Sequence, residues 1–238
     1  MNNCSEYVSS GHPDKVADLI ASYLLDEYIR HDPKTRFALE VQLKDHICNL
    51  AGEVTSAWQP SHEEIGDLVR DAIRKVGYTA EYAARWPDGA TLNADKVVVN
   101  SYIGQQSPDI AQGVDREGWG DQGIFCGMAT DESQFGYMPR DRYFAHEIGK
   151  RLYDTALRNE MPIGLDIKTL VSLNDGNDAE QMDIVPSGII HKLGLDGSGC
   201  NDMFFRLCRN GLFAYADILA LSEAGIDGVI APKDRKPL

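Results

Sequence analysis

The sequence predicts an α+β protein built from repeated helix-and-hairpin units. Apolar residues recur at three- and four-residue spacing in 13–30, 61–77 and 139–158, the pattern of helices that bury one face. Residues 37–54 and 167–185 each have the pattern of two strands joined by a turn. Because the order of helix and hairpin occurs twice, we expect a duplicated unit, although the two rounds have weak residue-level similarity.

In the first round the helix begins at Pro13, a residue suited to the first helical turn, and ends before Asp32-Pro33. Apolar and polar residues then alternate over 37–43, as in a half-buried strand. Lys44-Asp45-His46 turns the chain into a second strand that runs through Val54. These features predict a helix followed by an antiparallel hairpin.

The next helix has both a start and a stop signal. Ser61 and Glu64 have the spacing of a capping box, and Gly77 follows the last apolar position. Residues 96–103 predict a further strand. The following stretch, 104–123, is rich in Gly, Gln, Asp and Pro and predicts an exposed, irregular loop.

The second round repeats the pattern. The helix at 139–158 carries one apolar stripe, made of Phe144, Ile148, Leu152 and Ala156. Strands at 167–173 and 179–185 flank Asn174-Asp175-Gly176, a hairpin signal because Asp-Gly readily adopts positive φ. A helix-like stretch at 212–224 follows.

Composition bounds the class of protein. The 238 residues are 43% hydrophobic and 25% charged, as in globular proteins. A formal net charge of −14 opposes sequence-independent nucleic-acid binding, which needs a basic surface. No apolar run reaches the ~20 residues of a membrane helix, and no signal peptide is visible. Five scattered cysteines without a CxxC motif favour reduced thiols, so we expect a cytoplasmic protein without membrane or nucleic-acid partners.

Gly11-His12-Pro13-Asp14-Lys15 places an imidazole, a carboxylate and an ammonium at a helix start. A helix N-terminus favours anions through its free N–H groups and dipole. His12 and Lys15 would strengthen a phosphate site there, and Asp14 could hold the Mg²⁺ that accompanies a polyphosphate. The alternative is a helix that starts at proline and carries solvated charges.

Other polar groups leave two interpretations open. Asp121 between glycines and Gln106 near Pro108 offer binding groups, or belong to plain polar loops. Glu40 and Glu53 lie on the two predicted hairpin strands, where they reach one cleft or are simply solvated. The sequence has no nucleophile elbow, zinc-protease helix or P-loop. If the protein is an enzyme, its nucleophile therefore comes from a substrate.

Several short segments occur in an order and spacing that together are highly specific. They are 5–15 (SEYVSSGHPDK), 38–40 (ALE), 52–56 (GEVTS), 106–110 (QSPDI), 113–115 (GVD), 120–123 (GDQG), 129–133 (ATDES), 138–139 (MP) and 145–146 (AH). In these segments the chain resembles S-adenosylmethionine synthetase (methionine adenosyltransferase), in a shortened form. The resemblance implies attack of the methionine sulfur on C5′ of ATP, followed by hydrolysis of the released triphosphate to phosphate and diphosphate. It also implies Mg²⁺ and K⁺ as cofactors.

The resemblance assigns roles to residues that match the family's motifs. His12 would lie at the leaving oxygen, Lys15 would support the phosphates, and Lys168 would lie close to the nucleotide. Asp14 would bind Mg²⁺ and Glu40 would match the potassium site. The residues expected to bind methionine or ATP are Glu6, Glu53, Gln106, Asp121, Arg206 and Arg209.

The chain also departs from the family, whose members are considerably longer and have three related domains. We expect an N-terminal unit and loop at 1–115, a truncated second unit at 116–190 and a C-terminal remnant at 191–238. Cys200 stands where the family's triphosphate lysine is expected, and Arg206 or Arg209 would replace the lost charge.

Three functions follow from the resemblance. The first is a working synthetase, with the uncovered sheet faces forming a homodimer or higher oligomer. The second is an impaired relative that assembles with a full-length synthetase and regulates or completes it. The third is a residual binder of nucleotide or S-adenosylmethionine with altered chemistry.

Overall fold

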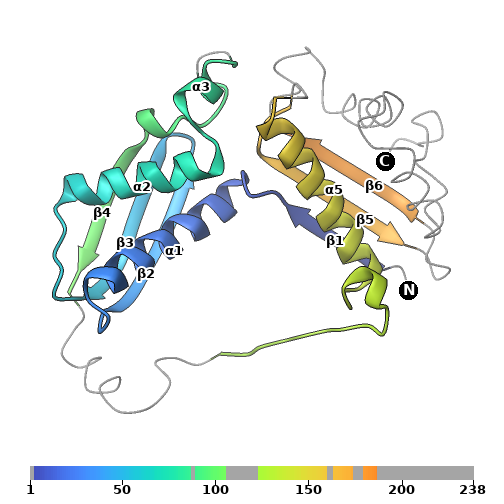
Figure 1. The fold of residues 1–238 in the computed structure, drawn as a ribbon, viewed down its shortest axis with the longest axis horizontal. Coiled ribbons are helices and arrows are strands. Elements are labelled where there is room, and N and C mark those ends of the chain that lie inside the picture. The colour runs from blue at the N-terminus through green and yellow to red at the C-terminus, as the bar shows by residue number, and fades with distance from the viewer. Residues whose placement is uncertain (1–2, 87–88, 106–122, 160–162, 174–178, 187–238) are drawn as a thin grey trace. The chain divides into compact units, whose positions relative to one another are not determined.

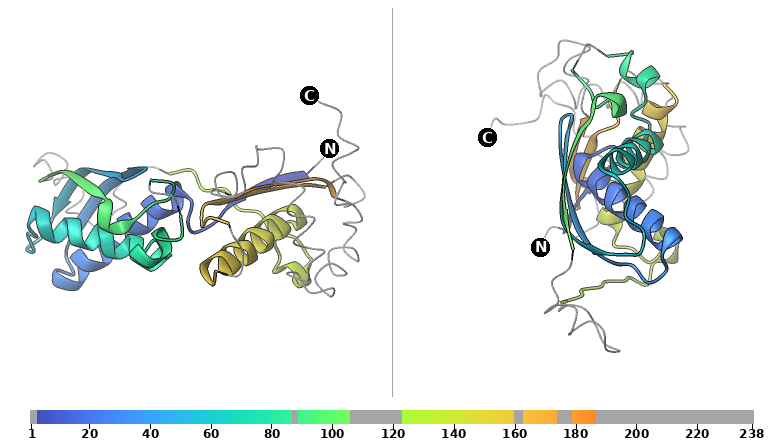
Figure 2. Two further views of the ribbon diagram at one scale, coloured as in Figure 1. Left: turned by 90° about the horizontal axis from the view of Figure 1, so that it is seen from above. Right: turned by 90° about the vertical axis from the view of Figure 1, so that its left-hand side faces the viewer.

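The structure is a computed structural model that describes residues 3–86, 89–105, 123–159, 163–173 and 179–186 (Figure 1). Its internal contacts divide the chain into two units. One unit combines Met1–His12 with the chain from Met128 onward, and the other is Pro13–Gly127. Both have helices on one face of a small sheet, so the predicted α+β class is confirmed (Figure 2).

The unit formed by Pro13–Gly127 contains a mixed sheet in the order β2-β3-β4. Its main elements are α1 (Pro13–His31), β2 (Arg36–Lys44), β3 (Ile47–Thr55), α2 (His62–Val76) and β4 (Val98–Gly104). Strand β3 pairs antiparallel with β2 and parallel with β4. A short α3 (Ala80–Ala83) and a 3₁₀ turn η1 (Ala94–Lys96) lie between α2 and β4. The 3₁₀ turn explains why the last strand begins two residues later than the sequence predicts.

Local signals in this unit act as predicted. The Ser61 hydroxyl accepts the N–H of Glu64, and the Glu64 carboxylate accepts the N–H of Ser61. Hydrogen bonds from Ser61 to the Glu64 carboxylate lower the pKa of Glu64, and the bond from the Ser61 N–H is the largest cause. Gly77 ends α2 at φ 110°, and Asp45 takes φ 53° in the hairpin turn. The capping box, the helix stop and the hairpin are therefore confirmed.

The core of this unit lies between its helices and one face of the sheet. Its fully buried side chains lie on α1, α2 and β3: Val16, Ile20, Leu24, Val69, Ile73 and Leu50. The opposite sheet face remains open, with Ile47, Val98 and Tyr102 49%, 58% and 70% exposed. The alternation of strand side chains therefore gives the sheet one core face and one open face.

The other unit has α5 on an antiparallel sheet in the order β1-β5-β6. Its elements are β1 (Asn3–Val8), η2 (Ser133–Phe135), α5 (Arg140–Leu157), β5 (Ile167–Leu173) and β6 (Ala179–Pro186). The predicted stripe of α5 is buried throughout: Phe144, Ile148, Leu152 and Ala156. The helix and hairpin of the second round are thus confirmed.

Strand β1 is a strand that no local sequence pattern predicts. It is short and contains Ser5 and Glu6, so it lacks a strong apolar alternation. It forms because β5, more than 160 residues along the chain, offers a complete pairing edge from Asn3↔Leu173 to Val8↔Lys168. Long-range pairing of this kind leaves little local signal.

Some predictions fall outside the described residues: the hairpin turn at 174–176 and the helix at 212–224. The predicted domain boundaries at 115 and 190 also fall there and remain predictions. Within the described part, no helix is long and apolar enough to span a membrane.

Candidate functional site

The His12 segment leads from β1 into α1. Pro13 is the first residue of α1 and Asp14 is the acidic residue of its first turn. His12 and Lys15 are half-buried, whereas Asp14 is exposed. The predicted helix start is confirmed. A helix N-terminus with an imidazole and an ammonium beside it in the chain is chemically suited to an anion.

The loop before His12 is tied to the start of β5. The buried Ser9 hydroxyl donates to the Leu165 carbonyl oxygen (2.6 Å) and accepts the Ile167 N–H (2.9 Å). The Ser9 N–H donates to the Ile167 carbonyl oxygen (2.9 Å), and the His12 N–H closes a turn onto the Ser9 carbonyl oxygen (3.0 Å). Four hydrogen bonds therefore fix the backbone that carries His12.

Lys168 and Glu6 lie together on the neighbouring strands of the same unit. Lys168 pairs with Val8 across β1 and β5, and its Nζ lies 3.5 Å from Oε1 of Glu6. The two side chains are 47% and 54% exposed, so this ion pair adds little stability. Arg142 also donates to the Glu6 carbonyl oxygen (2.5 Å). An ammonium and a carboxylate are thus accessible to a ligand near the end of β1 that leads to His12.

Glu40 and Glu53 belong to the other unit. The register Ala38↔Glu53 and Glu40↔Ala51 places both carboxylates on the open face of the sheet, on neighbouring strands. Glu40 is exposed and Glu53 half-buried. Gly52 beside Glu53 has φ 145°, and a Cβ there would overlap with the Ala38 backbone, so this close approach requires glycine.

The described residues contain no group of three or more His, Cys, Asp or Glu side chains arranged to hold a metal ion. Asp14 and Glu40 are single exposed carboxylates. Mg²⁺ commonly uses one or two protein carboxylates and completes its shell with water and substrate phosphates. The donor set near Asp14 therefore fits a metal that arrives with a polyphosphate, rather than a resident metal.

Four predicted binding residues lie outside the described residues: Gln106, Asp121, Arg206 and Arg209. Cys200, the position of the expected triphosphate lysine, lies outside them as well. Their predicted roles stay predictions.

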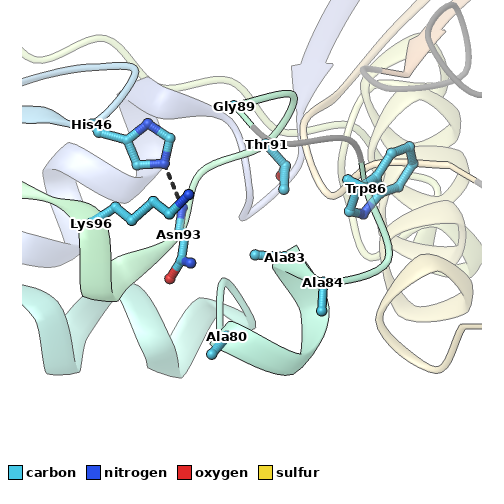
Figure 3. Close-up of a pocket in the computed structure, with 9 residues that line it drawn as sticks. All are labelled: His46, Ala80, Ala83, Ala84, Trp86, Gly89, Thr91, Asn93 and Lys96. Atoms are coloured by element: carbon cyan, nitrogen blue, oxygen red, sulfur yellow. Dashed lines mark hydrogen bonds between the residues drawn. The ribbon is translucent and has the colours of Figure 1, made fainter.

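A pocket of about 310 Å³ lies in the Pro13–Gly127 unit, and none of the residues that line it is a predicted site residue (Figure 3). Its apolar side includes Trp86 and the alanines of α3, and its polar side includes His46 and Lys96. The half-buried His46 accepts the Asn93 N–H at Nε2 (3.1 Å). His46 is therefore part of the packing around η1.

The sequence also does not indicate the residues whose contacts fix the backbone around His12 and Lys168. Ser9 and Gly11 lie within the SEYVSSGHPDK segment, but their spacing alone does not indicate a contact with Leu165. Thr169, 1% exposed, donates to the Ala145 carbonyl oxygen (2.7 Å) and so joins β5 to α5. Each contact spans a long stretch of chain, which no local pattern encodes.

By its fold and by the groups at the start of α1, this is an α+β chain with chemistry suited to an anionic ligand. Residues 1–108 match the family described as "S-adenosylmethionine synthetase, N-terminal domain". Through this match, residues 1–108 are similar to the N-terminal domain of the S-adenosylmethionine synthetase family, and the relatives below extend the similarity over more of the chain.

Two curated relatives and one solved structure are similar to the chain. The S-adenosylmethionine synthase of Zymomonas mobilis is 43% identical over 153 residues, which cover 62% of this chain and 37% of the relative. S-adenosylmethionine synthase 1 of Frankia casuarinae is 37% identical over 209 residues, which cover 81% of this chain and 49% of the relative. An unusual S-adenosylmethionine synthetase from Campylobacter jejuni is similar in structure, with a TM-score of 0.70 and 28% sequence identity. The similarity covers 88% of this chain and 53% of that protein. The chain spans about half or less of the length of these proteins.

Proposed function

We propose that the protein is a methionine adenosyltransferase, which transfers the adenosyl group of ATP to the methionine sulfur. The observation that carries the proposal is the family match over residues 1–108, which contain the His12 segment at the start of α1. The fold similarity to a synthetase, over 88% of the chain, supports it.

In the proposed reaction a lone pair of the methionine sulfur forms a bond to C5′ of ATP. The C5′–O bond breaks, and its electron pair leaves with the triphosphate oxygen. A thioether is nucleophilic without deprotonation, which agrees with the absence of a recognised base–nucleophile motif in the sequence. The protein must therefore align the two substrates and stabilise the charge that develops on the leaving oxygen. Water then cleaves the triphosphate into phosphate and diphosphate.

The polar groups described above have the chemistry for these tasks. His12 would donate to the leaving oxygen, while Lys15 and Lys168 would stabilise the negative triphosphate. Glu6, half-exposed beside Lys168, would help to place the ligand. Gln106, Asp121 and Glu53 would bind methionine, and Arg206 or Arg209 would supply further positive charge at the phosphates.

Asp14 would hold Mg²⁺ and Glu40 would contribute to a K⁺ site. Mg²⁺, when bound, would neutralise charge on the phosphate oxygens. The protein residues would keep the polyphosphate at the start of α1, where N–H groups and the helix dipole favour it. The reduced-type cysteine pattern supports a cytoplasmic setting for this chemistry.

We further propose that the protein works as a homodimer or higher oligomer. The open face of β2-β3-β4 presents Ile47 and Val98, which are paired in register, and Tyr102, which is paired with Ala51 further along the same two strands. Apolar side chains that are about half or more exposed on a flat sheet suit burial against another sheet. Cys200 at the expected lysine position favours a second candidate, a subunit that assembles with a full-length synthetase and is completed by it.

The catalytic assignment is tested with His12→Ala and Lys168→Met in the full chain. Removal of a transition-state donor typically lowers the rate by about 10²–10³, so we expect each variant to lose that much S-adenosylmethionine synthesis. His62→Gln and Lys150→Met are matched controls, because His62 and Lys150 are exposed and lie outside the proposed site. Equal activity of His12→Ala and His62→Gln would show that the assigned site is wrong.

A further inference from the structure

Ser9 is the most completely enclosed polar residue near the proposed site. It is 0% exposed, and its hydroxyl is both donor and acceptor to the main chain of residues 165–167. Regular pairing of β1 with β5 ends at the pair Val8↔Lys168, which are the sequence neighbours of Ser9 and Ile167. The hydroxyl and backbone of Ser9 therefore prolong the attachment of the chain to β5 beyond the last regular pair.

The same attachment continues to Gly11. A Cβ on Gly11 would lie 2.6 Å from the Leu165 Cβ, well inside ordinary van der Waals contact. The chain thus passes directly over Leu165, itself 0% exposed, before it reaches His12. The hydroxyl fixes one end of the loop, and the close approach at Gly11 fixes the other.

We propose that Ser9 is a positioning residue that holds the His12 imidazole in a fixed relation to the strand carrying Lys168. Its hydroxyl uses one donor and one acceptor bond to a segment that ends one residue before Lys168. The positioning is a property of the chain itself, and its catalytic consequence rests on the proposed function. Ser10, the next residue, has a hydroxyl too but is exposed, so the role belongs to Ser9 alone of the pair.

Alanine at position 9 would remove the hydroxyl and leave the Ile167 N–H without its acceptor inside the protein. A buried donor left without an acceptor is unfavourable, so the loop should open more often or shift. Thr169→Val is the matched control. It removes another buried hydroxyl of the same unit, one that donates to the Ala145 carbonyl oxygen of α5 (2.7 Å) and to the Tyr7 carbonyl oxygen of β1 (3.4 Å), and neither of these bonds involves the residue 9–12 loop.

The experiment compares the full-chain wild type, Ser9→Ala and Thr169→Val by three measurements. Amide exchange should accelerate at Ile167 and His12 by about tenfold or more in Ser9→Ala only. The His12 imidazole NMR signals should shift or broaden in that variant, while those of His46 and His62 remain unchanged. If the chain synthesises S-adenosylmethionine, kcat should fall about tenfold or more in Ser9→Ala, with KM for both substrates within about twofold. In Thr169→Val both constants should stay within about twofold.

Ser9→Ala behaving like Thr169→Val, with lower stability but an unchanged His12 signal, would overturn the proposal. The exchange and NMR measurements decide this even if the chain makes no product, so failure of the proposed function is recognised separately. Should Ser9→Ala not fold, Ser9→Cys retains the size and weakens the hydrogen bonds. Amide exchange in the wild-type protein is a further test. The hydrogen bonds of the Ile167 and His12 amides should open together, and independent opening would contradict the proposed attachment of the chain through Ser9, which we call the Ser9 clamp.

Discussion

Gly11→Ala tests whether the chain must pass closely over Leu165 to present His12. The added Cβ would lie 2.6 Å from the Leu165 Cβ, where favourable carbon contacts are about 3.5–4.0 Å. The backbone must therefore move by about 1 Å. Gly11 has no positive φ, so alanine tolerates the local conformation and the effect is steric.

The expected loss of stability follows from two opposing effects. Overpacking of a well-packed site costs about 1–3 kcal/mol. Replacing glycine restricts the unfolded chain and returns about 0.4–1 kcal/mol. We therefore expect a net destabilisation of about 1 kcal/mol, within a range of about 0–2.6 kcal/mol, together with a displaced His12.

The assay is urea unfolding combined with the His12 imidazole NMR signal. Gly127→Ala is the matched control, because a Cβ at Gly127 meets nothing within 4 Å and Gly127 has no positive φ. The control should be as stable as the wild type. A Gly11→Ala protein with unchanged stability and an unchanged His12 signal would refute the claimed close approach.

Three further predictions concern elements away from the proposed site. Ser61→Ala should lower the unfolding free energy in urea by about 1 kcal/mol, because α2 loses its capping box; an unchanged midpoint would contradict that role. Burial raises the pKa of Cys48 to about 11, so peptide mapping after iodoacetamide at pH 8 should show it labelled far more slowly than the exposed Cys126; equal rates would contradict its burial. Hydrogen bonds from Arg140 lower the pKa of Glu132 in the folded protein. The stability that this pairing contributes is therefore present above the pKa that Glu132 has in the unfolded chain, and it is lost as the pH falls through the pKa of Glu132 in the folded protein. In Arg140→Gln an NMR titration should give Glu132 a higher pKa, and an unchanged pKa would contradict the pairing.

Local chemistry explains which parts of the fold the sequence predicts. Ser61 and Glu64 need only each other and the helix backbone, so their spacing identifies the start of α2. The stripe on α5 is likewise a local repeat whose burial follows from one apolar face. Helix starts, stops and hairpins were thus predictable.

Contacts between distant parts of the chain were not predictable from the sequence. Strand β1 exists because Val8 and its neighbours pair with residues around Lys168, and the clamp at Ser9 depends on Leu165 and Ile167. A serine two residues before Gly11 has no local feature that predicts this contact. For the same reason the pairing of Glu6 with Lys168 is visible only in the folded chain.

The structure divides the predicted site residues between its two units. Glu6, His12 and Lys168 belong to one unit, in which the β1–β5 pairing and the Ser9 clamp bring their strands and loop together. Glu40 and Glu53 share the open sheet face of the other unit. Their roles in binding methionine, ATP and cations are proposals that rest on the family and on this chemistry.

Turnover by the purified full chain tests the central claim most directly. The chain is mixed with ATP, methionine, Mg²⁺ and K⁺, and S-adenosylmethionine and phosphate are followed together by mass spectrometry and colorimetry. The account predicts that both products form, and that both are lost in His12→Ala but not in His62→Gln. A correctly folded chain that forms neither product would contradict a self-sufficient methionine adenosyltransferase.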